Sequence, residues 1–124
     1  MTHEYTLLVG GIVLPRGGEP TVTAIAWAAD TVLALGGDDE VRAISRGDSH
    51  VVDLGGAFVI PVGPDGEVRW PVDAKLEVGG PADLAVLRLD PRVTAGVQAL
   101  ALIRGGRLVA GALPGDGWQI TEVT

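Results

Sequence analysis

Two histidines, His3 and His50, are the residues of this 124-residue chain best suited to acid–base chemistry or to binding zinc. A catalytic zinc site takes three or four His, Cys or carboxylate ligands, and two of its histidines usually lie close together on one element. Cysteine is absent here, so only carboxylates could complete such a set. We therefore expect no catalytic residue, no metal site and no cofactor in this chain.

The string Asp48-Ser49-His50 contains the residue types of a hydrolytic triad. Adjacent residues of a strand point to opposite faces, so Ser49 and His50 are badly placed to share a proton. We interpret the string as a loop that enters a strand.

The acidic run Asp38-Asp39-Glu40 could bind a cation, but acids are also favoured in the positive first turn of a helix. We expect Asp38 to cap a helix of about two turns, since Val41 and Ile44 then share one face. Gly47 lies where a left-handed residue commonly ends such a helix.

Three tryptophans beside one Phe and one Tyr are an uneven share of aromatic residues. A tryptophan in a small β domain is usually a core residue, but several together can also form an interface or a ligand platform. We predict Trp70, Trp27 and Trp118 as possible interface residues, with Trp70 the strongest candidate of the three.

Lys75 is interpreted as a solvated lysine, because its neighbours do not match those of a lipoyl or biotinyl carrier lysine.

Short apolar runs between Gly-Gly pairs predict a mainly β chain with one short helix. The glycine pairs fit no phosphate-binding pattern and indicate turns. Residues 64–66 are expected to form a turn, and residues 104–107 a two-residue hairpin. The expected strands cover residues 6–14, 22–29, 32–35, 50–54, 57–61, 67–70, 84–89, 100–104, 108–110 and 118–123.

The run from Val22 to Ala29 alternates with period two. Alanines 24, 26 and 28 share one face with Val22, whereas Ile25 and Trp27 lie on the other. Because both faces are apolar, we expect both to be at least partly buried.

The composition fits one domain, residues 1–124, that can bury a core without disulfide or metal staples. A (β/α)₈ barrel needs at least about 200 residues and is excluded.

The charge of the chain argues against a nucleic-acid partner, because 16 acidic residues stand against nine basic ones and leave a formal net charge of −7. Residues 7–14 are too short and too glycine-broken for a signal peptide or a membrane span. The cytoplasm is the default compartment.

The order of segments resembles the opening of amidohydrolase-superfamily enzymes, closest to those of the N-acyl amide type. LLVGGIV at 7–13 is similar to their first strand, which ends in a Gly-containing turn. AIAW at 24–27 and DTVLALG at 30–36 resemble the part that contains their DGRI-x-AVG strand. DDEVRAI at 38–44 and VVDLGGAFVIP at 51–61 look like the segment that leads into their catalytic barrel.

The later part of the chain follows the same order. LEVGGPADLAVL at 76–87 resembles the G-x-L-x-x-G-x-x-ADL-x-VLD segment after the barrel, and IRGGRLV at 103–109 resembles the closing hairpin. The metal-binding D-x-H-x-H motif and the barrel itself have no counterpart, so the resemblance carries over no metal ligand. Residues 1–61 thus match the pre-barrel segment, a hairpin within 62–75 replaces the barrel, and residues 76–124 match the post-barrel segment.

The resemblance implies the small composite β domain of metallo-dependent hydrolases, a buckled β-sandwich or pseudo-barrel that holds no catalytic residues. A free-standing copy would expose the face on which the barrel leans, and such apolar patches rarely stay uncovered. We expect the 62–71 hairpin or a second chain to cover it. The implied function is a binding or assembly module that forms a homo-oligomer or binds a protein partner; the alternative is an accessory subunit of an amidohydrolase acting on C–N bonds, with its barrel on another chain.

Overall fold

The computed structural model describes residues 5–16, 20–44, 49–70, 72–94, 96 and 98–111. Within these ranges the chain forms nine strands and one short helix, so the prediction of a mainly β fold with one helix is confirmed. The elements are β1 (Thr6–Val9), β2 (Ile12–Val13), β3 (Ala24–Ala28), β4 (Thr31–Gly36), α1 (Asp38–Arg42), β5 (His50–Asp53), β6 (Phe58–Pro61), β7 (Leu84–Leu87), β8 (Ala99–Arg104) and β9 (Arg107–Gly111).

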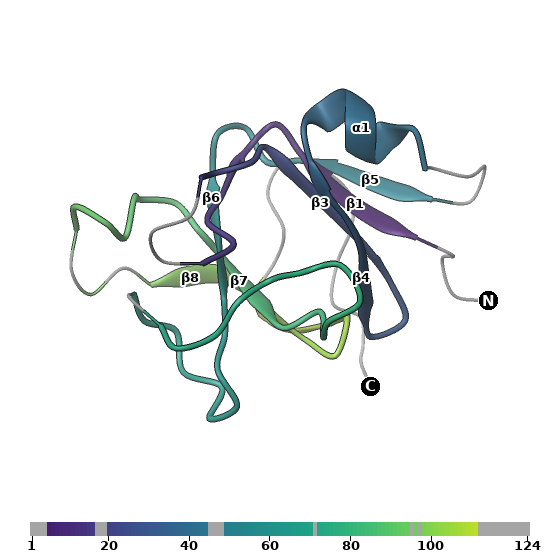
Figure 1. Cartoon of the computed structure of the whole chain (residues 1–124). Coiled ribbons are helices and arrows are strands. Elements are labelled where there is room, and N and C mark those ends of the chain that lie inside the picture. Colours follow the sequence, from purple (N-terminus) through teal and green to yellow (C-terminus); the bar gives the residue numbers. More distant parts are fainter. Residues whose placement is uncertain are drawn as a thin grey trace.

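The strands form two mixed sheets that pack against each other as in a β-sandwich (Figure 1). The four-stranded sheet has the order β4-β3-β1-β5 and the five-stranded sheet the order β2-β6-β7-β8-β9. The β1–β5 and β2–β6 pairs are parallel, and the other pairs are antiparallel. The expected strand at 6–14 is split at Gly10-Gly11, where the chain passes from the four-stranded sheet to the five-stranded one.

The main core fills the space between the sheets. Ile25 and Trp27 of β3 face this core, whereas Ala24 and Ala26 point to the other side of the strand and pack beneath α1. The predicted alternation and the burial of both faces of β3 are therefore confirmed. Side chains from both sheets complete the core, among them Leu8, Val32, Val52, Val59, Leu84, Val86 and Ile103.

Helix α1 covers the outer face of the four-stranded sheet (Figure 1). Its buried Val41 packs with Leu7 and Val9 of β1. The N-cap is Gly37 rather than the predicted Asp38, and the helix spans five residues instead of about two turns. Gly37 takes this position because Glu40 Oε1 accepts a hydrogen bond of 2.9 Å from its backbone nitrogen, and Asp38 then becomes the first helical residue. Gly47 lies outside the described residues.

The 62–70 segment lies on the outer face of the five-stranded sheet. The predicted turn is confirmed, because Gly66 N donates a hydrogen bond of 2.9 Å to Gly63 O. The predicted strand at 67–70 is wrong: these residues belong to no ladder, so the segment is not a hairpin. Instead, Val68 and Trp70 place apolar side chains on the sheet. Residues 67–70 are thus held by side-chain packing on a sheet face and not by backbone pairing.

The second predicted hairpin is confirmed. Arg104 pairs with Arg107 across a turn in which Gly105 and Gly106 both have positive φ, as a type I′ turn requires. The strand expected at 118–123 lies outside the described residues. Within the described ranges the helix α1 has five residues, far fewer than the roughly 20 apolar residues of a membrane-spanning helix.

Candidate functional site

His50, the histidine that the structure describes, is a strand residue. It opens β5 opposite Thr6, and its backbone nitrogen donates a hydrogen bond of 2.8 Å to Tyr5 O. Ser49 directly precedes the strand, so the interpretation of a loop that enters a strand is confirmed for these two residues. His3 and Asp48 lie outside the described residues. Within the described ranges, no three His, Cys, Asp or Glu side chains come close enough to hold a metal ion.

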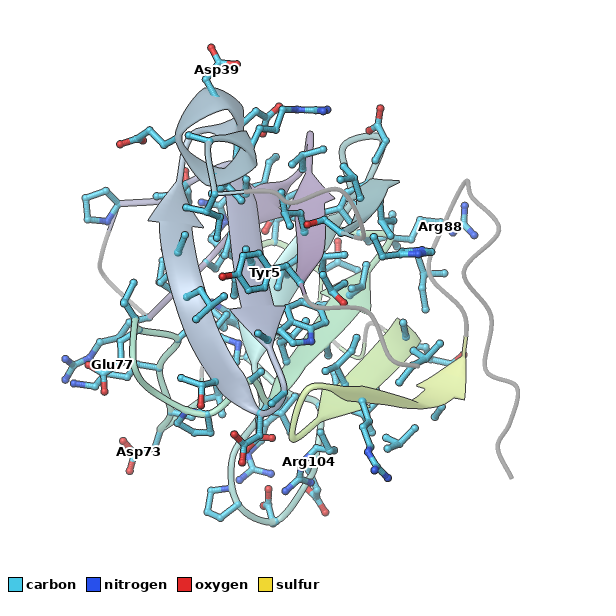
Figure 2. The ribbon with its side chains drawn as sticks, turned by 90° about the vertical axis from the view of Figure 1, so that its right-hand side faces the viewer. Tyr5, Asp39, Asp73, Glu77, Arg88 and Arg104 are labelled. Atoms are coloured by element: carbon cyan, nitrogen blue, oxygen red, sulfur yellow. The ribbon has the colours of Figure 1, made fainter. Side chains whose placement is uncertain are left out.

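Two carboxylates of the acidic run at the start of α1, those of Asp38 and Glu40, accept hydrogen bonds. Asp38 Oδ1 accepts hydrogen bonds from Gly10 N at 3.0 Å and from Thr23 Oγ1 at 2.9 Å. Asp39 points away from the molecule (Figure 2). Asp38 thus ties the helix to the β1–β2 turn and to the residue before β3, which is a structural role.

Replacing Asp38 by alanine is expected to lower the free energy of unfolding by about 1–3 kcal/mol, because two hydrogen bonds to a charged acceptor are lost. Asp39→Ala is the matched control and should change it by less than about 0.5 kcal/mol, since its side chain is exposed. Urea unfolding followed by circular dichroism measures both variants. Equal losses in the two would show that Asp38 does not anchor the helix.

The tryptophans differ in their surroundings. Trp27 is 1% exposed in the core between the sheets, so it does not lie on a surface where it could contact a partner. Trp70 is half-buried on the outer face of the five-stranded sheet, and Trp118 lies outside the described residues.

Lys75 is half-exposed and pairs with Glu77 at 3.3 Å between Nζ and Oε1, in keeping with a solvated lysine.

A pocket of about 160 Å³ opens beside Trp70 on this outer face, and we call it the Trp70 pocket. Ile60 of β6 and Leu87 of β7 form its floor. The 68–70 segment forms one wall, and the loop from β7 to β8 forms the other. The lining residues are Ile60, Val68, Arg69, Trp70, Leu87, Pro91, Thr94 and Gly96.

Charged side chains in each wall of the Trp70 pocket form ion pairs within that wall. Arg69 contacts Asp65 Oδ2 at 2.9 Å and Glu67 Oε1 at 2.8 Å, and Arg92 contacts Asp90 Oδ2 at 2.8 Å. The pKa of Asp65 is lowered by the Glu67 backbone N–H and then by Arg69, and the pKa of Asp90 is lowered mainly by Arg92. Both carboxylates therefore stay ionised to a lower pH than a free aspartate.

A second hollow, of about 320 Å³, lies where Arg16 meets residues 72–75. Its lining includes Asp73 and Lys75 and is more polar than that of the Trp70 pocket. None of the described residues that line it is aromatic, so the Trp70 pocket is the better candidate site.

Sequence reasoning singled out Trp70 but missed the opposite wall of its pocket. Pro91 and Thr94 carry no catalytic or metal-binding pattern. The sequence feature that could have pointed to this wall is Val93, an apolar residue directly after the turn sequence Asp90-Pro91-Arg92. In the structure Val93 is 82% exposed.

No family model matches the chain, and no curated protein matches it. Two solved structures are similar in part: uncharacterized metal-dependent hydrolases from Pyrococcus furiosus and Pyrococcus horikoshii OT3. The sequence identities are 22% and 21%, and the TM-scores are 0.44 and 0.43. Each match covers 47% of this chain, but only 13% and 12% of the respective hydrolase. A likeness of this extent assigns no superfamily to the chain.

Proposed function

We propose that the chain is a non-catalytic, amidohydrolase-like composite β domain that acts as a binding or assembly module through the Trp70 pocket. The observation that carries the proposal is an apolar pocket left open between the two segments that cover the outer face of the five-stranded sheet. The cytoplasm is the compartment that we propose with it.

The half-buried Trp70 supports a contact role for this face. Tryptophan is enriched among the residues that contribute most to protein interfaces, because its large ring gains much from the further removal of water. Each additional 100 Å² of apolar area that a partner covers would contribute about 2.5 kcal/mol before the cost of association. Exposed Leu89 and Val93, on the loop that forms the opposite wall, add apolar surface near the pocket.

The amidohydrolase part of the proposal rests on the order of segments in the sequence. In that scheme, residues 62–75 stand where the barrel would be inserted. The described part of this segment packs Val68 and Trp70 on the sheet and leaves the pocket beside them. A face that is only partly covered is what a β domain without its barrel would present.

The molar mass in solution and the binding of an apolar fluorescent dye, measured on the same samples, test the proposal. We expect either an assembly or a monomer whose dye fluorescence rises several-fold, since an open apolar face binds such dyes. Trp70→Ser should lower dye binding by a monomer, whereas Trp70→Phe should retain most of it. A folded monomer that binds no dye would contradict the module role.

Two further measurements separate the alternatives. Hydrolysis of N-acyl amides with added zinc should not exceed the rate in buffer; zinc-dependent turnover by the purified chain would overturn the non-catalytic assignment. A dye-binding monomer that co-purifies with an amidohydrolase barrel lacking its own β domain would instead identify the chain as an accessory subunit acting on C–N bonds.

A further inference from the structure

We infer that the partner of the Trp70 pocket is a second copy of this chain, which inserts Val93 into it. This inference rests on the proposed function, because it names the occupant of the same surface. Val93 is the most exposed large apolar residue in the described part of the chain, at 82%. An apolar side chain this exposed gains from any pocket that removes it from water.

The turn that carries Val93 is held in place by Asp90. Asp90 O accepts hydrogen bonds from Thr94 N at 3.0 Å and from Val93 N at 3.3 Å. Its Oδ1 accepts another from Arg92 N at 2.9 Å. Val93 is thus presented on an ordered turn, which reduces the conformational entropy that binding would cost.

Val93 and one wall of the Trp70 pocket belong to the same loop, between β7 and β8. Pro91, Thr94 and Gly96 line the Trp70 pocket, and Val93 projects from the same turn into solvent. A two-fold axis beside this turn would place the Val93 of each copy at the pocket of the other, so both pockets are filled by one symmetric contact. The pocket volume of about 160 Å³ is close to that of a cavity known to hold benzene, about 150 Å³, so a valine side chain fits.

The balance of charges at this face allows a second copy to approach it. Residues 62–70 and 88–94 together carry three acids and three arginines, whereas the whole chain carries a formal charge of −7. Two copies that meet here bring no net charge together, and the rim charges Arg69 and Arg92 are already paired within each copy. Mutual repulsion, which grows with net charge, is therefore weak at this face.

Sedimentation of the full chain over a concentration series tests the inference, with Val93→Glu as the test variant and Val78→Glu as its matched control. Val78 is also an exposed valine, at 62%, but lies away from the pocket. We expect the wild type and Val78→Glu to dimerise and Val93→Glu to dimerise at least ~10-fold more weakly, since a charge would enter an apolar pocket. Equal dimerisation of both variants would overturn the inference.

Cross-linking tests the contact itself, because the chain has no native cysteine. A mixture of Val68→Cys and Val93→Cys, one of them carrying a mass tag, should form a mixed disulfide under mild oxidation. A mixture of Val68→Cys and Val78→Cys should not, and equal yields in both would show non-specific collisions. A dye-binding wild-type monomer would overturn this inference and leave the proposed function standing, whereas a monomer that binds no dye would overturn both.

Discussion

Trp27→Ala is expected to lower the free energy of unfolding by about 3–5 kcal/mol, the range for removing a fully buried aromatic side chain. Trp27 lies in the core between the two sheets and is 1% exposed. Its indole nitrogen also donates a hydrogen bond of 2.9 Å to Gly106 O, in the β8–β9 turn. The substitution therefore removes apolar packing in the core and a polar link between the sheets.

Two variants show whether the loss comes from packing. Trp27→Phe keeps a six-membered aromatic ring in the core and loses the indole hydrogen bond and only part of the ring volume, so it should cost clearly less than Trp27→Ala. Trp70→Ala should also cost less, because Trp70 is only half-buried. Urea unfolding at equal protein concentration measures all three. If Trp70→Ala proved as costly as Trp27→Ala, the main core would not lie where the structure places it.

The second large effect is expected at Gly106, in the turn between β8 and β9. A Cβ at this position would overlap the Ala29 carbonyl group and lie 3.2 Å from Trp27 Cδ1. Its φ of +79° disfavours any L side chain. Left-handed strain of about 1–2 kcal/mol and overpacking of about 1–3 kcal/mol predict that Gly106→Ala destabilises the fold by about 2–5 kcal/mol.

Gly105→Ala is the matched control for this prediction. Gly105 also has positive φ, at +59°, but a Cβ there would meet no atom within 4 Å. It should therefore carry only the backbone strain, about 1–2 kcal/mol. Thermal unfolding of both variants, read by circular dichroism, distinguishes them. Equal shifts would mean that the turn does not pack against Ala29, and that the two sheets are not joined at this point.

The strands could be predicted from local patterns because each pattern has a local cause. The alternation in β3 follows from burial on both faces, and the Gly-Gly pair of the β8–β9 turn follows from its need for positive φ. The helix cap was missed by one residue. Asp38 is a good capping residue, but its carboxylate is bound by Gly10 N and Thr23 Oγ1, and these donors are distant in the sequence.

The outer face of the five-stranded sheet could not be predicted in detail, because its arrangement depends on contacts between distant segments. Residues 67–70 alternate like a strand, yet Val68 and Trp70 pack onto a sheet face without a backbone partner. The Trp70 pocket forms only where this segment meets the loop around Pro91 and Thr94. Composition indicated that Trp70 was unusual, but the opposite wall and the exposed Val93 depend on the tertiary fold.

The most direct test of the contact surface is a set of amide NMR spectra of the wild-type chain, recorded as its concentration is raised and again with apolar dye added. If the Trp70 pocket is the contact surface, signals from Val68, Trp70 and Thr94 shift, while those from Asp39 and Val78 stay fixed. Shifts centred on α1, or spectra that change neither with concentration nor with dye, would contradict a contact at this pocket.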